Sequence, residues 1–264
     1  METFGIDSRF GKALLAEVTV NGMLVVSVQP GHESFQSLPI HQDVLPGANR
    51  LEVILTVPVA PGAPLPLGDP MSMFVDIAVE ADHVRDIGES YEVTTSLVRE
   101  ARWQADEGAP LTLPHRMAID WVVPSSITPP IWTRAQRATP EQARMVIVSE
   151  LQELRRLLEA RQIDAFQNRM RLRNEDMARA YPITGSANRR ADLDSAMLAD
   201  LLPETPRFAS IDPARLQIRP FADGRVLAVQ MDDGKAPLRC GSPTNPIEIA
   251  TTFAMIDGRM AVVR

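Results

Sequence analysis

The 264-residue chain has one cysteine, Cys240. A single cysteine forms no internal disulfide and cannot by itself build a zinc site, so we interpret Cys240 as a small buried residue of a strand. No run of about 18 apolar residues, the length that a membrane helix needs, occurs. The first residues also lack a basic segment followed by an apolar stretch. We therefore expect a cytoplasmic protein with no membrane partner.

Lysine is scarce as well, with Lys12 and Lys235 against 25 arginines, a bias typical of a GC-rich bacterial genome. The net charge of -7 is unevenly distributed. Residues 1–130 hold 7 basic and 17 acidic side chains, a charge of -10, whereas residues 131–264 carry +3. A nucleic-acid-binding protein needs a concentrated positive face, so we expect no nucleic-acid partner. The acidic half suits a charged protein partner, or the other half of the chain.

Histidine is absent from residues 116–264. The four histidines lie earlier, at His32, His41, His83 and His115. His41 and Asp43 would share a face of an expected strand, and a metal there would need a third ligand from His32, Glu33 or His83. The spacing does not require a metal, and we predict no metal and no cofactor.

Signatures of the common catalytic classes are missing too. The chain has no HExxH or paired CxxC motif, no nucleophile elbow, no P-loop and no dinucleotide-binding fingerprint. We therefore predict no catalytic residues, although an active site needs no linear signature. The sequence favours a protein that is not an enzyme.

The first half has the pattern of strands and turns. Apolar residues alternate with others in residues 14–20, and Asn21-Gly22 is a strong hairpin signal because both residue types tolerate positive φ. In "LPGANRLEVIL", Pro46 and Gly47 predict a type II turn before a second alternating run, residues 51–57. Six or seven such strands predict an antiparallel β-sandwich over residues 1–128.

The period changes after a proline-rich segment that begins at Pro124 and that we interpret as a linker. Thr139, Pro140 and Gln142 predict a capped helix start, and apolar residues between 147 and 158 recur at helical spacing. Asp164 and Gln167 predict the cap of a second helix over residues 165–181, and a third helix is predicted over residues 191–202.

The rest of the second half is expected to form strands. Three Asp-Gly pairs, at residues 223–224, 233–234 and 257–258, separate short apolar runs and predict an antiparallel meander. Three helices packed on one face of a meander sheet predict a second, α+β domain over residues 139–264.

Two short stretches carry a family resemblance. The pattern "VTVNGMLVV" followed by "LPGANRLEVIL" resembles the jelly-roll modules of the galactose-binding-like superfamily over residues 13–57, which implies a β-sandwich. A carbohydrate-binding module also needs exposed aromatic planes around the strand loops. Phe74, Tyr91, Trp103 and Trp121 lie on expected strands instead, where we predict that they pack in the core.

The second half resembles the nuclear-transport-factor-2-like fold over residues 141–264. The resemblance rests on "ELRRLLEARQIDAFQNRM", with its helix break, and on the closing hairpin "EIATTFAMIDGRMAVVR". It implies a conical cavity, where enzymes of this fold use His, Asp or Tyr. This half has no histidine and one tyrosine, so the resemblance brings no catalytic group with it. The candidate cavity-lining residues, which could equally fill the core, are Phe166, Met170, Tyr181, Phe253 and Met255.

Two functions remain after these exclusions. The sequence favours a non-enzymatic bacterial binding protein, for example an immunity or adaptor protein whose acidic β-domain docks a protein partner. The candidate binding residues at the rim of that domain are His41, Asp43, Asn49 and Arg50. The alternative is a small-molecule-binding protein or enzyme that uses the cavity of the second domain. The arginines between residues 155 and 179 form either a solvated helical face or a patch for an anionic partner.

Overall fold

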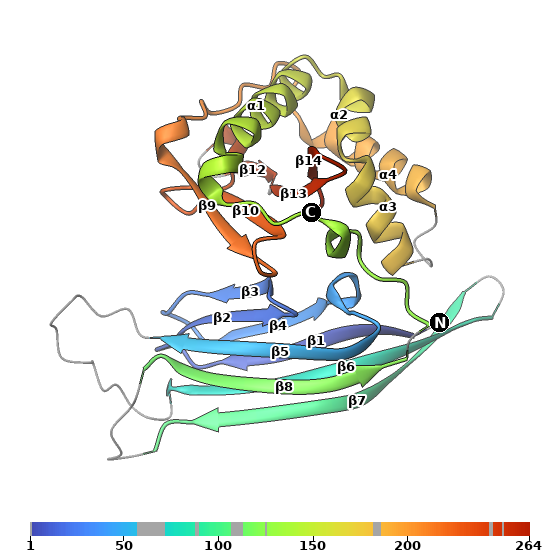
Figure 1. Cartoon of the computed structure of the whole chain (residues 1–264), viewed down its shortest axis with the longest axis vertical. Helices are drawn as coiled ribbons and strands as arrows, with labels where there is room; N and C mark the ends of the chain where they lie inside the picture. Colours follow the sequence, from blue (N-terminus) through green and yellow to red (C-terminus); the bar gives the residue numbers. More distant parts are fainter. Residues whose placement is uncertain are drawn as a thin grey trace, which may run out of the picture. The chain divides into compact units, whose positions relative to one another are not determined.

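The chain folds into two compact units, residues 1–129 and 130–264. The computed structural model, drawn in Figure 1, describes residues 2–56, 72–87, 90–106, 113–124, 126–181, 186–242, 245–249 and 251–264. The regular structure described in the first unit is mainly β, whereas the second unit combines helices with strands. No described helix has the length and apolar character needed to cross a membrane.

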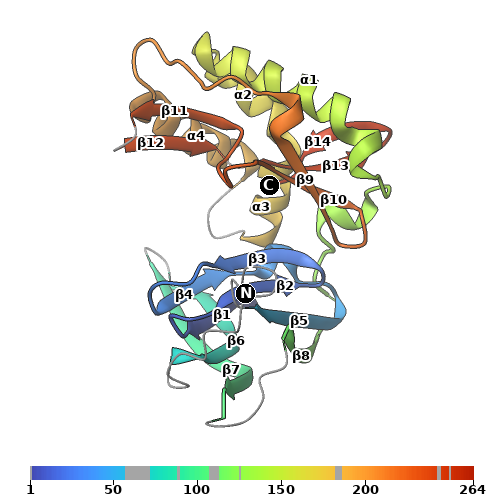
Figure 2. The same cartoon turned by 90° about the vertical axis from the view of Figure 1, so that its left-hand side faces the viewer.

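The described residues of the first unit form two four-stranded antiparallel sheets. The first, here called the β1 sheet, has the order β4 (Ser34–Pro39), β1 (Glu2–Phe10), β6 (Phe74–Asp86) and β7 (Tyr91–Gln104). The second, the β2 sheet, has the order β3 (Met23–Val28), β2 (Leu15–Val20), β5 (Gly47–Thr56) and β8 (His115–Val123). Figure 2 shows the two sheets as separate layers.

The inward side chains of the two sheets share one hydrophobic core. Val18, Leu51 and Leu55 are fully buried, as their alternation predicts, and burial of each such side chain stabilises the fold by about 1.5–3 kcal/mol. Trp121 is buried too, at 4% exposed. The prediction that Tyr91 packs in the core is wrong, because it is 50% exposed. Tyr91 pairs with Asp86, which lies beyond His83, the last β6 residue that pairs with β1.

The predicted turns of this unit are present. Asn21 and Gly22 have φ of 51° and 78°, and Gly47 has φ of 87°. The strand expected around His41 is wrong, however. Residues His41–Asp43 form a 3-10 turn in which Asp43 N–H donates to Ile40 O at 2.8 Å. Val57, the last residue of the expected alternating run 51–57, lies outside the described residues.

The described part of the second unit has four α-helices, α1 (Pro140–Glu159), α2 (Ile163–Arg169), α3 (Arg171–Ala180) and α4 (Ala187–Leu201). The predicted start of α1 is confirmed: Thr139 and Gln142 form a reciprocal capping box, and Pro140 occupies the first turn. The predicted buried stripe is confirmed as well, since Ile147 and Leu151 are both 0% exposed. α1 contacts β9 and β14.

Two helix starts differ from the sequence prediction. The second helix begins at Ile163, so Asp164 lies within it and does not cap it. The helix predicted as continuous is divided into α2, which ends at Arg169, and α3, with the buried Met170 between them. The third, α4, begins at Ala187 because Ser186 Oγ accepts from Arg189 N at 3.3 Å. A serine cap one turn upstream therefore decides where this helix starts.

The segment expected to be a linker belongs in part to the second unit. Ile131 and Trp132 are buried, at 8% and 5% exposed, in a 3-10 turn over Ile131–Arg134. Gln136 then forms an isolated β-bridge with Met255. Because proline-rich composition signals irregular backbone rather than exposure, the buried residues within it were missed.

The strands of this unit do not form the predicted meander. They are β9 (Leu216–Phe221), β10 (Val226–Met231), β11 (Leu238–Ser242), β12 (Asn245–Ile249), β13 (Thr251–Ile256) and β14 (Arg259–Val262). One sheet has the order β14-β13-β10-β9, and β11 pairs with β12 in a separate hairpin. The Asp-Gly turns were correctly placed, but a turn fixes where the chain reverses and not which strands pair. Cys240 on β11 is buried, as predicted.

Candidate interaction surface

The predicted rim residue Asn49 is part of a turn. Its side chain is buried, with Oδ1 accepting from Leu45 N at 2.7 Å and from Asn21 Nδ2 at 2.8 Å. Its Nδ2 donates to the carbonyls of Leu45 and Gly47, at 2.8 and 2.9 Å. The Asn49 amide therefore holds the loop that opens β5, and its hydrogen-bonding groups point into the protein.

The other three rim residues divide between buried and exposed. His41 and Asp43 are 6% and 0% exposed, and the His41 ring stacks on Phe4 with 5.8 Å between ring centroids. Arg50 is exposed, and its guanidinium contacts the carboxylates of Glu52 and Asp120, both at 3.2 Å. Of the four predicted rim residues, the structure leaves Arg50 facing solvent.

The structure does not bring the considered metal ligands together. Glu33 pairs with Arg9 at 2.8 Å, whereas His83 lies 3.8 Å from Glu2 and 3.2 Å from Ser96. Among the residues that the structure describes, no group of His, Cys, Asp or Glu could hold a metal ion.

The candidate cavity-lining residues of the second unit lie in or beside its core. Phe166, Met170 and Phe253 are 2%, 4% and 0% exposed and belong to one hydrophobic cluster. Tyr181 and Met255 are partly buried, and Met255 O accepts from Gln136 N at 2.8 Å. The first three therefore serve as packing residues.

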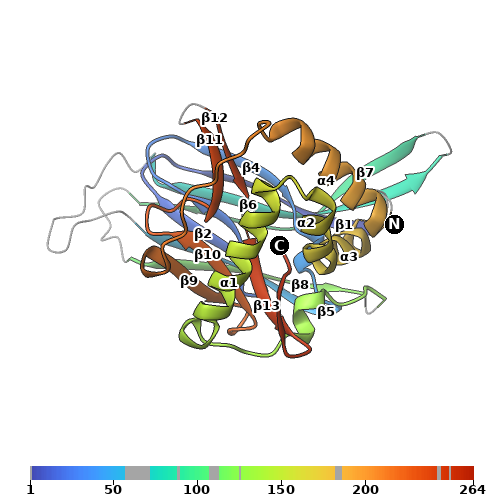
Figure 3. The same ribbon diagram turned by 90° about the horizontal axis from the view of Figure 1, so that it is seen from above.

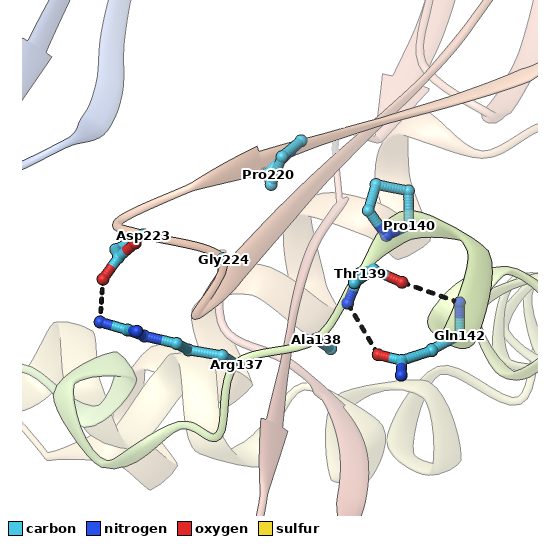
Figure 4. Close-up of a pocket in the computed structure, with 8 residues that line it drawn as sticks. All are labelled: Arg137, Ala138, Thr139, Pro140, Gln142, Pro220, Asp223 and Gly224. Carbon is cyan, nitrogen blue, oxygen red and sulfur yellow. Dashed lines mark hydrogen bonds and ion pairs between the residues drawn. The ribbon is translucent and has the colours of Figure 1, made fainter.

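A pocket of about 480 Å³ lies elsewhere in the second unit, at the start of α1 and beside the β9–β10 turn (Figure 4). Arg137 and Asp223 form an ion pair at its edge, and Ala138 N–H donates to Gly224 O at 2.9 Å. The remaining lining residues are Thr139, Pro140, Gln142 and Pro220. The capping box already occupies the N–H groups of Thr139 and Gln142. The cationic group among the lining residues is therefore the Arg137 guanidinium, which is paired with Asp223.

The arginine-rich helices make internal contacts. The ion pairs are Arg155–Glu159, Arg156–Glu153, Arg169–Glu150, Arg171–Glu175, Arg173–Asp194 and Arg179–Asp176. Burial raises the pKa of Asp176, whose Oδ1 also accepts from Ile131 N at 2.9 Å. Arg161 donates to the carbonyls of Ala199, Leu202 and Pro203, at 2.9, 2.9 and 2.7 Å. These contacts support a role in helix packing over a patch for an anionic partner.

An exposed apolar row that the sequence prediction missed lies at the end of the β6–β7 hairpin. The pairing of β1 with β6 ends at Glu2 and His83. The β6–β7 hairpin continues past that point, and its residues 84–86 pair with residues 91–93. Figures 1 and 3 both show this end of the hairpin extending past β1. Tyr91, Val93 and Leu97 are 50%, 55% and 58% exposed. They occupy alternate positions of β7 and so lie on one face.

An acidic row on β6 runs beside these apolar residues. Glu80 pairs with Leu97 and Asp82 with Thr95, whose hydroxyl donates to Asp82 Oδ1 at 2.7 Å. Burial, followed by the nearby carboxylates of Asp7 and Asp82, raises the pKa of Glu80. The repulsion between the Glu80 carboxylate and those of Asp7 and Asp82 lowers the stability of the folded protein. A cationic partner would offset this repulsion. We call Glu80, Asp82, Tyr91, Val93 and Leu97 the hairpin surface.

The same face of the β1 sheet is hollowed nearer its centre. A shallow pocket of about 510 Å³ is lined by Arg9, Glu33, Phe74, Asp76, Arg102, Trp103 and Gln104. The Arg9 guanidinium lies 5.0 Å from the Phe74 ring centroid, and Arg102 lies 3.3 Å from Glu100 and 3.7 Å from Asp76. The charges of this hollow are thus balanced within the chain.

The sequence contains no local signal for the exposure of the hairpin surface. "YEVTTSL", residues 91–97, has the high β propensity of a packed strand and one charge, yet in the structure all seven residues are exposed. Comparisons of the chain with protein-family models, with curated proteins and with solved structures find no match. The two fold resemblances therefore stay predictions.

Proposed function

We propose that this chain is a non-enzymatic binding protein of the bacterial cytoplasm whose acidic β-rich unit docks a protein partner on the hairpin surface. The observation that supports this proposal is an exposed apolar row, Tyr91, Val93 and Leu97, directly beside the carboxylates of Glu80 and Asp82. Protein interfaces commonly combine an apolar centre with a charged rim.

The chemistry of the hairpin surface suits a partner with an apolar ridge bordered by basic side chains. The apolar row would contact the ridge, and the carboxylates of Glu80 and Asp82 would pair with lysine or arginine side chains around it. The net charge of -10 over residues 1–130 would steer such a basic protein toward this unit. An immunity or adaptor protein that covers the basic surface of a toxin would be one instance of this function.

Site-specific photo-crosslinking in cells of the source bacterium tests the proposal. A benzophenone amino acid at Val93 should cross-link one protein partner, whereas the same group at Ser37, exposed on β4, should not. Asp82→Arg should weaken capture of that partner, and so should raised salt, because both oppose the attraction of opposite charges. Equal cross-linking from both positions, or none from Val93, would overturn the proposal.

A second candidate function is small-ligand binding in the pocket at the start of α1. Its volume of about 480 Å³ lies within the range of ligand pockets, and the Arg137 guanidinium could orient an anionic group. A screen of small carboxylates and phosphates by thermal shift tests this function. A ligand that raises the Tm of the wild type and leaves the Tm of Arg137→Ala unchanged would support it. A screen without such a ligand would remove it.

A further inference from the structure

Among the strands that the structure describes, β7 lies at an edge of the β1 sheet, and its first seven residues are all exposed. Proteins usually protect such edges with lysine, proline, inward charges or bulges, because an open edge pairs with another strand. Residues 91–97 contain no lysine, proline or glycine, and Glu92 is their one charged residue. The pairing of β6 and β7 is regular until the shift between Val79 and Glu80, opposite the residues that follow Leu97. The exposed edge is therefore regular and unprotected over this segment.

We propose that a second copy of this chain pairs with residues 91–97 of β7 in antiparallel register, with Thr94 on the two-fold axis. Strand addition of this kind gains main-chain hydrogen bonds along the edge. This proposal names a second copy of the chain as a partner that binds beside the hairpin surface. It rests on the proposed function, because both use the exposed end of the β6–β7 hairpin.

The segment is complementary to itself in this register. Tyr91 would lie opposite Leu97 of the second copy, and Val93 opposite Thr95 of the second copy. Such aromatic–aliphatic and β-branched cross-strand pairs are favourable. Thr94 would face Thr94 of the second copy, and Glu92 would face Ser96 of the second copy, so no like charges would be opposed.

The irregularity in β7 selects this register over its neighbours. A two-fold at Thr95 would place Tyr91 opposite Arg99 of the second copy, on the far side of the irregularity, where the side-chain alternation is interrupted. A two-fold at Val93 would pair five residues of the segment instead of seven. Thr94 is therefore the centre that uses the whole regular segment.

Pairing would also enlarge the hairpin surface. Tyr91, Val93 and Leu97 lie on one face of β7. A two-fold axis perpendicular to the sheet keeps this face on the same side in both copies. The two apolar rows would then run side by side across the axis. A partner with two binding sites could engage both, with a gain in avidity.

Disulfide trapping of the full chain tests the register. Thr94→Cys in a Cys240→Ser background should give a disulfide-linked dimer on mild oxidation, because the two Thr94 positions face each other. The matched control is Thr95→Cys. Its two copies would be diagonal neighbours about 7–8 Å apart, beyond the usual Cα separation of about 4.4–6.8 Å for a disulfide. Equal trapping of both variants, or none of Thr94→Cys, would overturn the register.

Sedimentation equilibrium tests the pairing without cysteines. The wild type should dimerise, and Thr94→Lys, which opposes two ammonium groups at the axis, should raise the dimer Kd by about tenfold or more. Part of the loss should be recovered when salt is raised from about 0.1 to about 1 M, where the Debye length falls from about 10 to about 3 Å. Ser37→Lys, on the opposite edge strand of the same sheet, should leave the Kd unchanged.

A wild type that stays monomeric, or a Thr94→Lys variant that dimerises equally well, would overturn the proposal. The proposed function fails separately. If the protein is monomeric and Val93 still cross-links another protein, only the self-pairing is wrong. If the dimer forms and Val93 cross-links only a second copy, the pairing stands and the separate protein partner is wrong.

Discussion

The side chains of Asn21 and Asn49 are joined by a hydrogen bond, with 2.8 Å between Asn21 Nδ2 and Asn49 Oδ1. Asn21 is at the tip of the β2–β3 hairpin, and Asn49 is near the start of β5. Asn21 Oδ1 also accepts from Arg50 N at 3.0 Å, and Asn21 Nδ2 donates to Asp43 O at 2.8 Å. The polar residues of the predicted rim thus connect two turns of the β-rich unit.

Asn49→Ala should destabilise the protein by about 2–3 kcal/mol, because it removes several hydrogen bonds and leaves partly buried backbone groups at Leu45 and Gly47 without that partner. Urea unfolding followed by far-UV circular dichroism measures the loss. Arg50→Ala is the control: it removes exposed ion pairs and should cost less than about 1 kcal/mol. An Asn49→Ala protein of wild-type stability would contradict a structural role.

Gly11→Ala should cost about 2 kcal/mol or more, because a Cβ at Gly11 would lie 2.1 Å from Ser72 O. The obstructing atom belongs to the backbone, so relief requires the chain on either side to move. Gly5→Ala provides a matched control within β1, since its Cβ would lie 3.4 Å from Leu38 O, an ordinary contact distance. Thermal unfolding of both variants should show a large fall in Tm for Gly11→Ala alone.

Glu80→Gln should make the stability of the protein less dependent on pH. Because the folded-state pKa of Glu80 is raised, by burial first and then by Asp7 and Asp82, its contribution to stability is present below its unfolded pKa. That contribution is lost as the pH rises through the folded pKa. The glutamine variant should therefore match the wild type near pH 3 and exceed it by about 0.5 kcal/mol at pH 7.

Denaturant unfolding at several pH values measures the effect of Glu80→Gln. Glu92→Gln, which removes an exposed carboxylate 3.6 Å from Arg85, should show no such gain at pH 7. An advantage of Glu80→Gln that grows toward low pH would show that Glu80 is stabilised by its surroundings when it is ionised. The same variant should bind a basic partner more weakly, since it removes a carboxylate from the hairpin surface.

Arg161→Ala should destabilise the protein by about 1–2 kcal/mol, because three carbonyl groups at the end of α4 lose their donor. Arg161 has a φ of 52°, and alanine would have the same backbone constraint, so the difference reports the side chain. Arg171→Ala removes a surface ion pair with Glu175 and should cost about 0.3–0.5 kcal/mol. Urea unfolding that gives equal losses for both would contradict the capping role.

Local features of the fold were predictable because neighbouring residues determine them. The positive φ of Asn21 and Gly22, the capping box of Thr139 and Gln142, and the burial of the 147–158 stripe each depend on a few adjacent residues. Boundaries were less predictable where two signals competed. Asp164 offered one cap, but the helix already begins at Ile163.

The sequence by itself determined the turns, the alternating faces of the strands and the amphipathic face of α1, since backbone sterics and hydrophobic period act over short range. Only the tertiary structure decided that β10 pairs with β13, because strand pairing joins residues far apart in the chain. It alone decided that Asn49 turns inward while Tyr91, on an equally strand-like run, stays exposed. Burial depends on which other elements cover a residue, and no local pattern contains that information.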